Sequence, residues 1–146
     1  MQAYLVHHAD AVGPEIDSQR PLSAQGQAQA EWLADQVKAA GFVPPVIWHS
    51  GKLRSRQTAE AFLRHCNPFA EFRMVRGLRP EDPADWMLHE LQAAPADVLL
   101  VGHMPNIAAL LSLLDPDAAP FPVHGFVALD RATHGGWMER WRAKSP

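Results

Sequence analysis

The sequence lacks several features that would place a protein in a structural or functional class at once. Its single cysteine, Cys66, excludes an intrachain disulfide and any Cys-x-x-Cys metal or redox motif. No apolar run approaches the roughly 20 residues that a membrane helix needs, and residues 1–6 lack the basic start and long apolar region of a secretory signal. A net charge of −3 provides no basic face for a nucleic acid. These absences favour a cytoplasmic protein with neither a membrane nor a nucleic-acid partner.

The remaining composition is that of an ordinary globular chain. Of its 146 residues, 47% are hydrophobic and 20% are charged, which suffices to bury a substantial core. The 13 prolines and nine glycines are scattered, with no internal repeat and no linker that would divide the chain. We therefore expect residues 1–146 to form a single domain, and the sequence sets no oligomeric state.

Short apolar runs alternate with helical patterns along the chain. Strands are expected at Tyr4–Val6, Val46–Trp48, around Phe72–Met74 and at Val98–Val101. The intervening helices are expected at 24–40, in KLRSRQTAEAFLRHC, at 84–94 and from Pro105 onward, and HGFVALD and GGWMERWRA close the chain as a hairpin. The first helix shows an apolar stripe at Ala28, Trp32, Leu33, Val37 and Ala40. This order predicts a three-layer αβα sandwich around a mixed, mostly parallel sheet.

Polar residues of one character follow three of the expected strands. His7 and His8 follow the first strand, Ser50 and Arg54 follow the second, and His103 follows Val98–Val101. Ligands of open α/β sheets bind outside the carboxyl ends of the strands, so these side chains are expected to converge. The helix that begins after His103 and the guanidinium of Arg54 both favour an anion. Taken singly, they are explained at least as well by a solvated histidine pair, a capping histidine and a surface arginine; their joint placement indicates a phosphoryl site.

Metal binding is the other chemistry that a chain with eight histidines suggests. Adjacent His7 and His8 would point to opposite sides of an extended strand, and no HExxH helix spacing is present. We therefore expect neither a catalytic metal nor another cofactor.

The segments YLVHHADA, RPLSAQG, HSGKLRSRQTAE and VGHMPNIAALL resemble, in order and spacing, the motifs of the histidine phosphatase superfamily, which includes the phosphoglycerate mutases. The short chain, the continuation Ala9-x-Ala11 and the ending FPVHGFVALD…W are most similar to its SixA-type phosphohistidine phosphatase branch. The resemblance spans essentially the whole chain and implies a phosphoglycerate mutase-like fold.

The resemblance implies a role for each matched residue. His8 becomes the nucleophile that is transiently phosphorylated, and Arg54 and His103 stabilise the transferring group. Arg20, in RPLS, matches an arginine of the loop before the first long helix, and Ser50 joins it as a candidate substrate-binding residue.

One position departs from the family pattern. The arginine that normally precedes the nucleophile is replaced by His7, so the pocket loses a permanent positive charge. If His7 serves as the phosphate ligand in place of arginine, it would help most as the imidazolium. The replacement is compatible with weakened catalysis, with a pH-dependent pocket, or with a module that binds phosphate or a phosphoprotein without turnover.

The general acid is the least defined part of the expected site. Glu81, in LRPED, is the nearest match, with Asp82 and Asp10 as rivals. A phosphohistidine substrate needs an acid less, because its imidazole leaving group titrates near ~6.5. The resemblance implies a phosphatase acting on phosphohistidine in a protein, with hydrolysis of a small phosphate ester as the alternative, and the faint acid motif is compatible with phosphohistidine. Mutase activity is disfavoured because so short a chain has little room to enclose a sugar phosphate.

Overall fold

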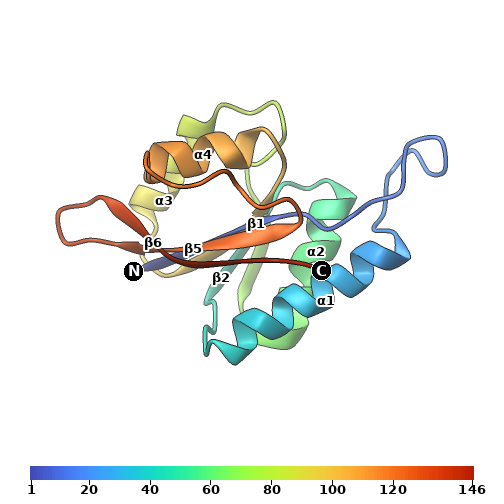
Figure 1. Cartoon of the computed structure of the whole chain (residues 1–146), viewed down its shortest axis with the longest axis horizontal. Helices are drawn as coiled ribbons and strands as arrows, with labels where there is room; N and C mark the ends of the chain where they lie inside the picture. Colours follow the sequence, from blue (N-terminus) through green and yellow to red (C-terminus); the bar gives the residue numbers. More distant parts are fainter.

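A computed structural model describes the whole chain, residues 1–146, as six strands and four helices (Figure 1). The strands are β1 (Gln2–His7), β2 (Val46–His49), β3 (Glu71–Met74), β4 (Val98–Gly102), β5 (Gly125–Arg131) and β6 (Trp137–Lys144). The helices are α1 (Ala24–Ala39), α2 (Leu53–Cys66), α3 (Ala84–Ala93) and α4 (Asn106–Leu114). All six strands join one sheet in the order β3-β2-β4-β1-β5-β6. Strands β1 to β4 pair in parallel and β5 and β6 antiparallel, which confirms the predicted mixed, mostly parallel sheet.

Helices α1 and α2 cover one face of this sheet and α3 and α4 the other (Figure 1). Each face is sealed by a cluster of 17 buried residues. Alternate residues of a strand enter opposite clusters: Leu5 and Leu100 contribute to the α3–α4 side, whereas Val6 and Val101 contribute to the α1–α2 side. The central strands are continuously apolar because both of their faces are covered.

Helix α1 presents a different stripe to the sheet from the one its apolar residues suggest. Leu33 and Val37 are buried as expected, but Ala28 and Ala40 are exposed. Polar Gln29 is buried instead, because its Oε1 atom accepts the backbone N–H of Asp10 at 2.9 Å. The orientation of the helix is thus set partly by a hydrogen bond to the loop after β1.

Strand β3 is less buried than its alternating sequence predicts. It pairs only with β2 and forms one edge of the sheet. Met74, expected with Phe72 in a third strand, is 60% exposed, and Phe72 is only partly buried. An edge strand with one neighbour leaves more of its side chains open to solvent.

The residues that the sequence analysis selected lie at the edge of the sheet formed by the carboxyl ends of its parallel strands. In the parallel register His7 lies beside Gly102, and His49 beside Val101, so β1, β2 and β4 end together. Strand β5 runs in the opposite direction and begins at this same edge, where Phe126 pairs with Val6. No helix in the structure combines the length and the apolar character that crossing a membrane would need.

Candidate active site

His8 occupies the first position after β1, and two backbone contacts fix it there. Its N–H donates to the carbonyl oxygen of Gly102 at 3.1 Å. Its ring atom Nδ1 lies 2.7 Å from the carbonyl oxygen of Ala9. A carbonyl oxygen only accepts, so Nδ1 carries the ring hydrogen of the neutral imidazole. The lone pair of Nε2 is therefore left for chemistry.

The surroundings of His8 favour this neutral form. Burial, followed by the charges of Arg54, His124 and Arg20, lowers the pKa of His8 to about 4, although the bond to Ala9 acts in the opposite direction. His8 is consequently an unprotonated imidazole at neutral pH.

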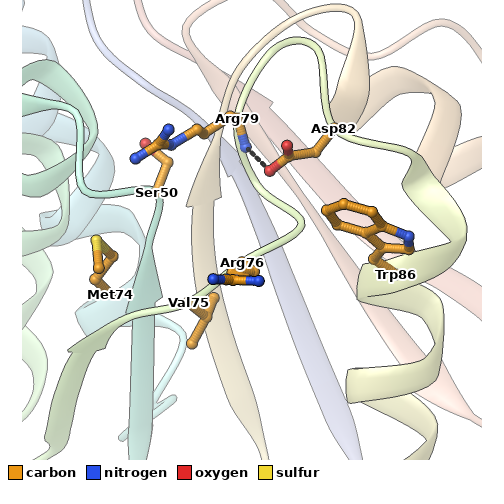
Figure 2. A pocket seen from close by; sticks show the side chains of 7 residues that line it. All are labelled: Ser50, Met74, Val75, Arg76, Arg79, Asp82 and Trp86. Atoms are coloured by element: carbon orange, nitrogen blue, oxygen red, sulfur yellow. Dashed lines mark hydrogen bonds between the residues drawn. The ribbon is translucent and has the colours of Figure 1, made fainter.

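His103 lies against His8 with 4.9 Å between the ring centroids and is only 1% exposed. Its Nε2 atom is 2.7 Å from Ser50 Oγ, which also accepts the backbone N–H of Lys52. Ser50 lines a hollow beside the site together with Arg79 (Figure 2). Burial, then the charges of His8 and Arg54, lower the pKa of His103 to about 2. The other ring nitrogen, Nδ1, is buried without a hydrogen-bond partner in the chain.

Arg54 and Arg20 supply the positive charge of the site. Arg54 stands in the first turn of α2, and its Nε atom is buried without a partner in the chain. Arg20 has a positive φ of 51°, and its Nε–H donates to the carbonyl oxygen of Val12 at 3.0 Å. Burial and then the charge of Arg20 lower the pKa of Arg54, which shows that both guanidinium groups act on one region. Unpartnered buried donors are rare, and the free Nε–H of Arg54 is suited to donate to an oxygen of an anion.

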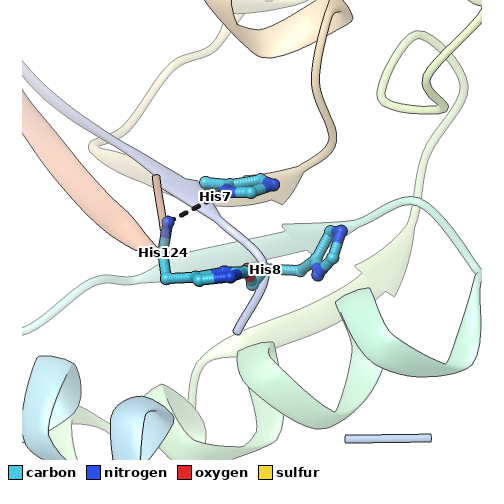
Figure 3. A group of neighbouring side chains, drawn as sticks. All are labelled: His7, His8 and His124. Atoms are coloured by element: carbon cyan, nitrogen blue, oxygen red, sulfur yellow. Dashed lines mark hydrogen bonds between the residues drawn. The ribbon is translucent and has the colours of Figure 1, made fainter. Parts of the chain in front are cut away.

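His7 is held by a contact that decides its protonation (Figure 3). Its Nδ1 atom accepts the backbone N–H of His124 at 2.9 Å, and the two rings are stacked with centroids 5.0 Å apart. The neutral ring therefore carries its hydrogen on Nε2. Burial, then the charges of His8, His124 and Arg54, lower the pKa of His7 to about 3. This contact disfavours the imidazolium form expected of a phosphate-binding His7, because a proton on Nδ1 would oppose the His124 N–H.

His124 is a component of the site that the sequence analysis missed. Its own Nδ1–H donates to the carbonyl oxygen of His8 at 2.8 Å, so it holds both histidines that follow β1. It precedes β5, an antiparallel strand whose amino end lies at this edge. The rule for the carboxyl ends of parallel strands does not cover His124, but the expected closing hairpin, whose first strand HGFVALD begins at this residue, indicates it.

The comparisons with known proteins agree with this geometry. The family model of the histidine phosphatase superfamily (branch 1) matches residues 7–96. The chain belongs to the histidine phosphatase superfamily. An uncharacterised protein of Picosynechococcus sp. is 32% identical over 115 residues, which is 73% of this chain and 68% of that protein.

Solved structures of SixA proteins share the fold. The protein histidine phosphatase SixA complexed with tungstate superposes with a TM-score of 0.88 at 24% identity, covering 99% of this chain and 97% of that one. A candidate phosphohistidine phosphatase SixA from Agrobacterium tumefaciens has a TM-score of 0.83 at 25% identity, covering 99% and 98% of the two chains.

Residues of the superfamily motif around Arg54 also hydrogen-bond to the backbone of the loop that follows β1. Thr58 Oγ1 accepts the backbone N–H of Ala9 at 3.0 Å and donates to the carbonyl oxygen of Arg54. Gln57 Oε1 accepts the N–H of Leu22 at 2.7 Å. The residues in S-x-x-x-R-x-x-Q-T-A thus connect α2 to the two ends of the loop that carries Arg20.

The three acidic candidates for a superfamily general acid differ in how they are engaged. Asp82 accepts the backbone N–H groups of Gly77 and Arg79, both at 3.0 Å. Asp10 accepts the hydroxyl of Ser23, the N-cap of α1, at 2.6 Å. Glu81 is exposed, and its charge partly offsets the lowering of the Arg54 pKa by burial and by Arg20. Of the three, Glu81 is the carboxylate left without a hydrogen bond in the chain.

The imidazoles of His7, His8 and His124 each bring a ring nitrogen within 4.8 Å of the others. A divalent metal needs an unprotonated lone pair from each ligand. Nδ1 of His7 is used to accept the His124 N–H, which leaves the hydrogen on Nε2. Two lone pairs remain, from Nε2 of His8 and of His124, and these fall short of the three protein ligands of a catalytic zinc site.

Proposed function

We propose that this chain is a phosphatase that works through phosphorylated His8 and acts on phosphohistidine in a protein. The single observation behind the proposal is the contact of His8 Nδ1 with the Ala9 carbonyl, which leaves the Nε2 lone pair free. That nitrogen belongs to a ring in contact with His103 and lies within the field of Arg54 and Arg20. A neutral nucleophile beside cationic donors is the arrangement that phosphoryl transfer requires.

The reaction has two steps. Nε2 of His8 attacks phosphorus while the bond from phosphorus to the substrate nitrogen breaks, and the substrate ring, protonated on its other nitrogen, departs as neutral imidazole. Arg54, Arg20 and the Nε2–H of His7 hold the phosphoryl oxygens, and Ser50 orients His103 beside them. Water then attacks the phosphoryl group on His8, which releases inorganic phosphate and restores the neutral ring. Throughout, the bond from Nδ1 to Ala9 prevents attack by the wrong nitrogen.

Two of the three candidate acids, Asp82 and Asp10, are held by hydrogen bonds, which supports phosphohistidine over a phosphate ester as the substrate. An alkoxide leaving group needs protonation, whereas imidazole titrates near ~6.5 and departs easily. Glu81 is the one free carboxylate of the three candidates, and it lies exposed on the loop before α3. The SixA relative from A. tumefaciens, at 25% identity, is named for phosphohistidine. Hydrolysis of a small phosphate ester is the alternative, with Glu81 as its acid.

A binding module without turnover is the second candidate. It is favoured by one observation, the neutral state of His7, which supplies a single N–H donor where an arginine supplies a fixed charge. Such a module would retain phosphate on Arg54 and Arg20 but transfer it slowly.

The experiment that separates these readings compares the intact chain with His8→Ala and with His89→Ala, which removes an exposed histidine of α3. Each protein is mixed with a chemically phosphorylated histidine protein and, separately, with an aryl phosphate. We expect the intact chain and His89→Ala to release phosphate, and mass spectrometry of their quenched reactions to show phosphate on His8. We expect neither result for His8→Ala. Activity that survives in His8→Ala would exclude the mechanism. If the chain binds phosphate but none of the three proteins releases phosphate from either substrate, the chain is a binding module.

A further inference from the structure

Two adjoining hollows flank the proposed phosphate site and share Arg79. The first, of about 340 Å³, is lined by Ser50, Arg76, Arg79, Asp82, Trp86 and the side chains at 74–75 (Figure 2). The second, of about 470 Å³, is lined by Lys52, Arg54, Arg56 and Arg79 together with residues 18–19, 51 and 53. Ser50 and Arg54 connect the hollows to the site, because Ser50 Oγ lies 2.7 Å from His103 Nε2 and the charge of Arg54 acts on His8.

Positive charge is concentrated in these hollows although the chain as a whole is acidic. Five of its 13 Lys and Arg residues line them, against one of its 16 Asp and Glu residues. That one acid, Asp82, has a carboxylate oxygen bound by the backbone N–H groups of Gly77 and Arg79. Two acids act near the hollows: the charge of Glu81 partly offsets the lowering of the Arg54 pKa by burial and by Arg20, and Glu90 lines a neighbouring hollow with Arg76.

The cations are also largely without acidic partners in the chain. Lys52, Arg54, Arg76 and Arg79 form no ion pair, and Arg56 has one long exposed contact with Glu60 at 3.9 Å. Elsewhere on the surface, Arg64, Arg73, Arg140 and Arg142 each pair with a carboxylate at 3.2 Å or less. Unpaired like charges repel one another, and an anionic ligand relieves that repulsion.

We propose that the two hollows dock an acidic segment of the phosphorylated protein, on both sides of its phosphohistidine. This inference rests on the proposed function and specifies the partner. Arg56 on α2 and Arg76 and Arg79 on the loop after β3 are exposed and lie on separate elements, so they contact an extended chain more readily than a compact ester. Trp86, 48% exposed at the far rim, adds an aromatic surface for an apolar residue of that segment.

The binding test uses fluorescein-labelled peptides with a central unphosphorylated histidine, flanked by glutamates in one peptide and by glutamines in another. Anisotropy at low salt is measured for the intact chain and for the double variant Arg76→Ser, Arg79→Ser. The matched control is Lys38→Ser, Arg64→Ser, which removes two charges where α1 and α2 end, away from the site. We expect the glutamate peptide to bind about tenfold more tightly to the intact chain and the control, with the preference lost in the docking variant and in high salt.

The kinetic test uses the same peptides after phosphorylation of histidine. The ratio of KM between glutamine and glutamate peptides is expected to fall from about ten to about one in the docking variant. Equal KM values in an active intact chain would overturn the docking surface alone. An inactive chain that still prefers the glutamate peptide would overturn the proposed function alone. Tripolyphosphate that binds more tightly than the glutamate peptide, and loses affinity in the same variant, would show a small polyanion as the occupant and overturn the proposal.

Discussion

The backbone N–H of His124 donates to Nδ1 of His7 at 2.9 Å and thereby determines which nitrogen of His7 carries hydrogen. His7 stands where the superfamily pattern has arginine, yet it presents a neutral Nε2–H donor rather than a charge. The fixed positive charge of the site therefore rests on Arg54 and Arg20. His124 in turn holds the carbonyl oxygen of His8, so one residue orders both imidazoles.

Replacing His7 by asparagine and by leucine tests the acceptor role of Nδ1. Asparagine Oδ1 is able to accept the His124 N–H, whereas leucine leaves that buried donor unpaired. An unpaired buried donor costs about 1–3 kcal/mol, so His7→Leu should unfold at lower urea concentration than His7→Asn. The check is the free energy of unfolding of both variants at neutral pH. Equal stabilities would show that the bond contributes nothing.

Restoring the superfamily arginine gives a second test. Arg offers no acceptor, and its guanidinium would enter space next to the stacked ring of His124. We expect His7→Arg alone to lose about 1–3 kcal/mol of stability. The double variant His7→Arg, His124→Ala should recover part of that loss, because the ring is removed. A double-mutant cycle measures the coupling, and strictly additive effects would contradict the packing argument.

Much of the fold follows from the sequence because its strands are buried on both faces. The run Val98–Val101 is covered on both faces, and the residues that bound this short apolar run indicate a buried strand. The edge of the sheet was less predictable: Met74 alternates like a buried residue but lies on a strand with one neighbour. The orientation of helix α1 is set partly by the hydrogen bond that the Asp10 N–H donates to Gln29, a contact between separate elements that periodicity does not encode.

The site divides in the same way. His8, Arg54 and His103 follow parallel strands, and the topological rule alone brings them to one edge. His124 enters from an antiparallel strand, outside that rule. The protonation of His7 depends on a single hydrogen bond across 117 positions of sequence, and no local pattern determines such a contact.

The titration of His8 and His7 supplies a third prediction. Their pKa values, lowered to about 4 and about 3 from the ordinary 6.5, mean that the folded chain keeps both rings neutral where the unfolded chain binds protons. The contribution of the two histidines to the free energy of unfolding is therefore at its full value above about pH 6.5. It falls as the pH drops toward 4, by about 1.4 kcal/mol per unit for each histidine. NMR titration of the ring C–H signals checks the midpoints. A midpoint near 6.5 for either ring would contradict the burial argument.

Gly26 provides a fourth prediction, because at this residue α1 closely approaches the backbone of the loop that follows β1. A Cβ atom at this position would lie 1.8 Å from the carbonyl oxygen of Asp10, which is backbone and cannot swing away. Gly26→Ala should therefore destabilise the fold by about 1–3 kcal/mol, although alanine ordinarily favours a helix. Gln25→Ala, at the exposed neighbouring position, is the control and should unfold like the parent chain. Thermal unfolding of both variants decides the matter, and a stabilised Gly26→Ala would refute the close approach.

The last prediction concerns Thr58, whose hydroxyl joins the backbone beside the proposed nucleophile to the helix that carries Arg54. Oγ1 accepts the N–H of Ala9 and donates to the carbonyl oxygen of Arg54, and the side chain is fully buried. Thr58→Val keeps the shape but leaves the Ala9 N–H unpaired, so we expect a loss of about 1–3 kcal/mol in stability. We also expect a fall in kcat larger than any change in KM, because Ala9 supplies the carbonyl that orients His8. Thr58→Ser retains the hydroxyl and should recover kcat while it keeps a small packing deficit. If the valine and serine variants turn over phosphohistidine at the same rate, the hydroxyl does not position His8, and the bond serves the fold alone.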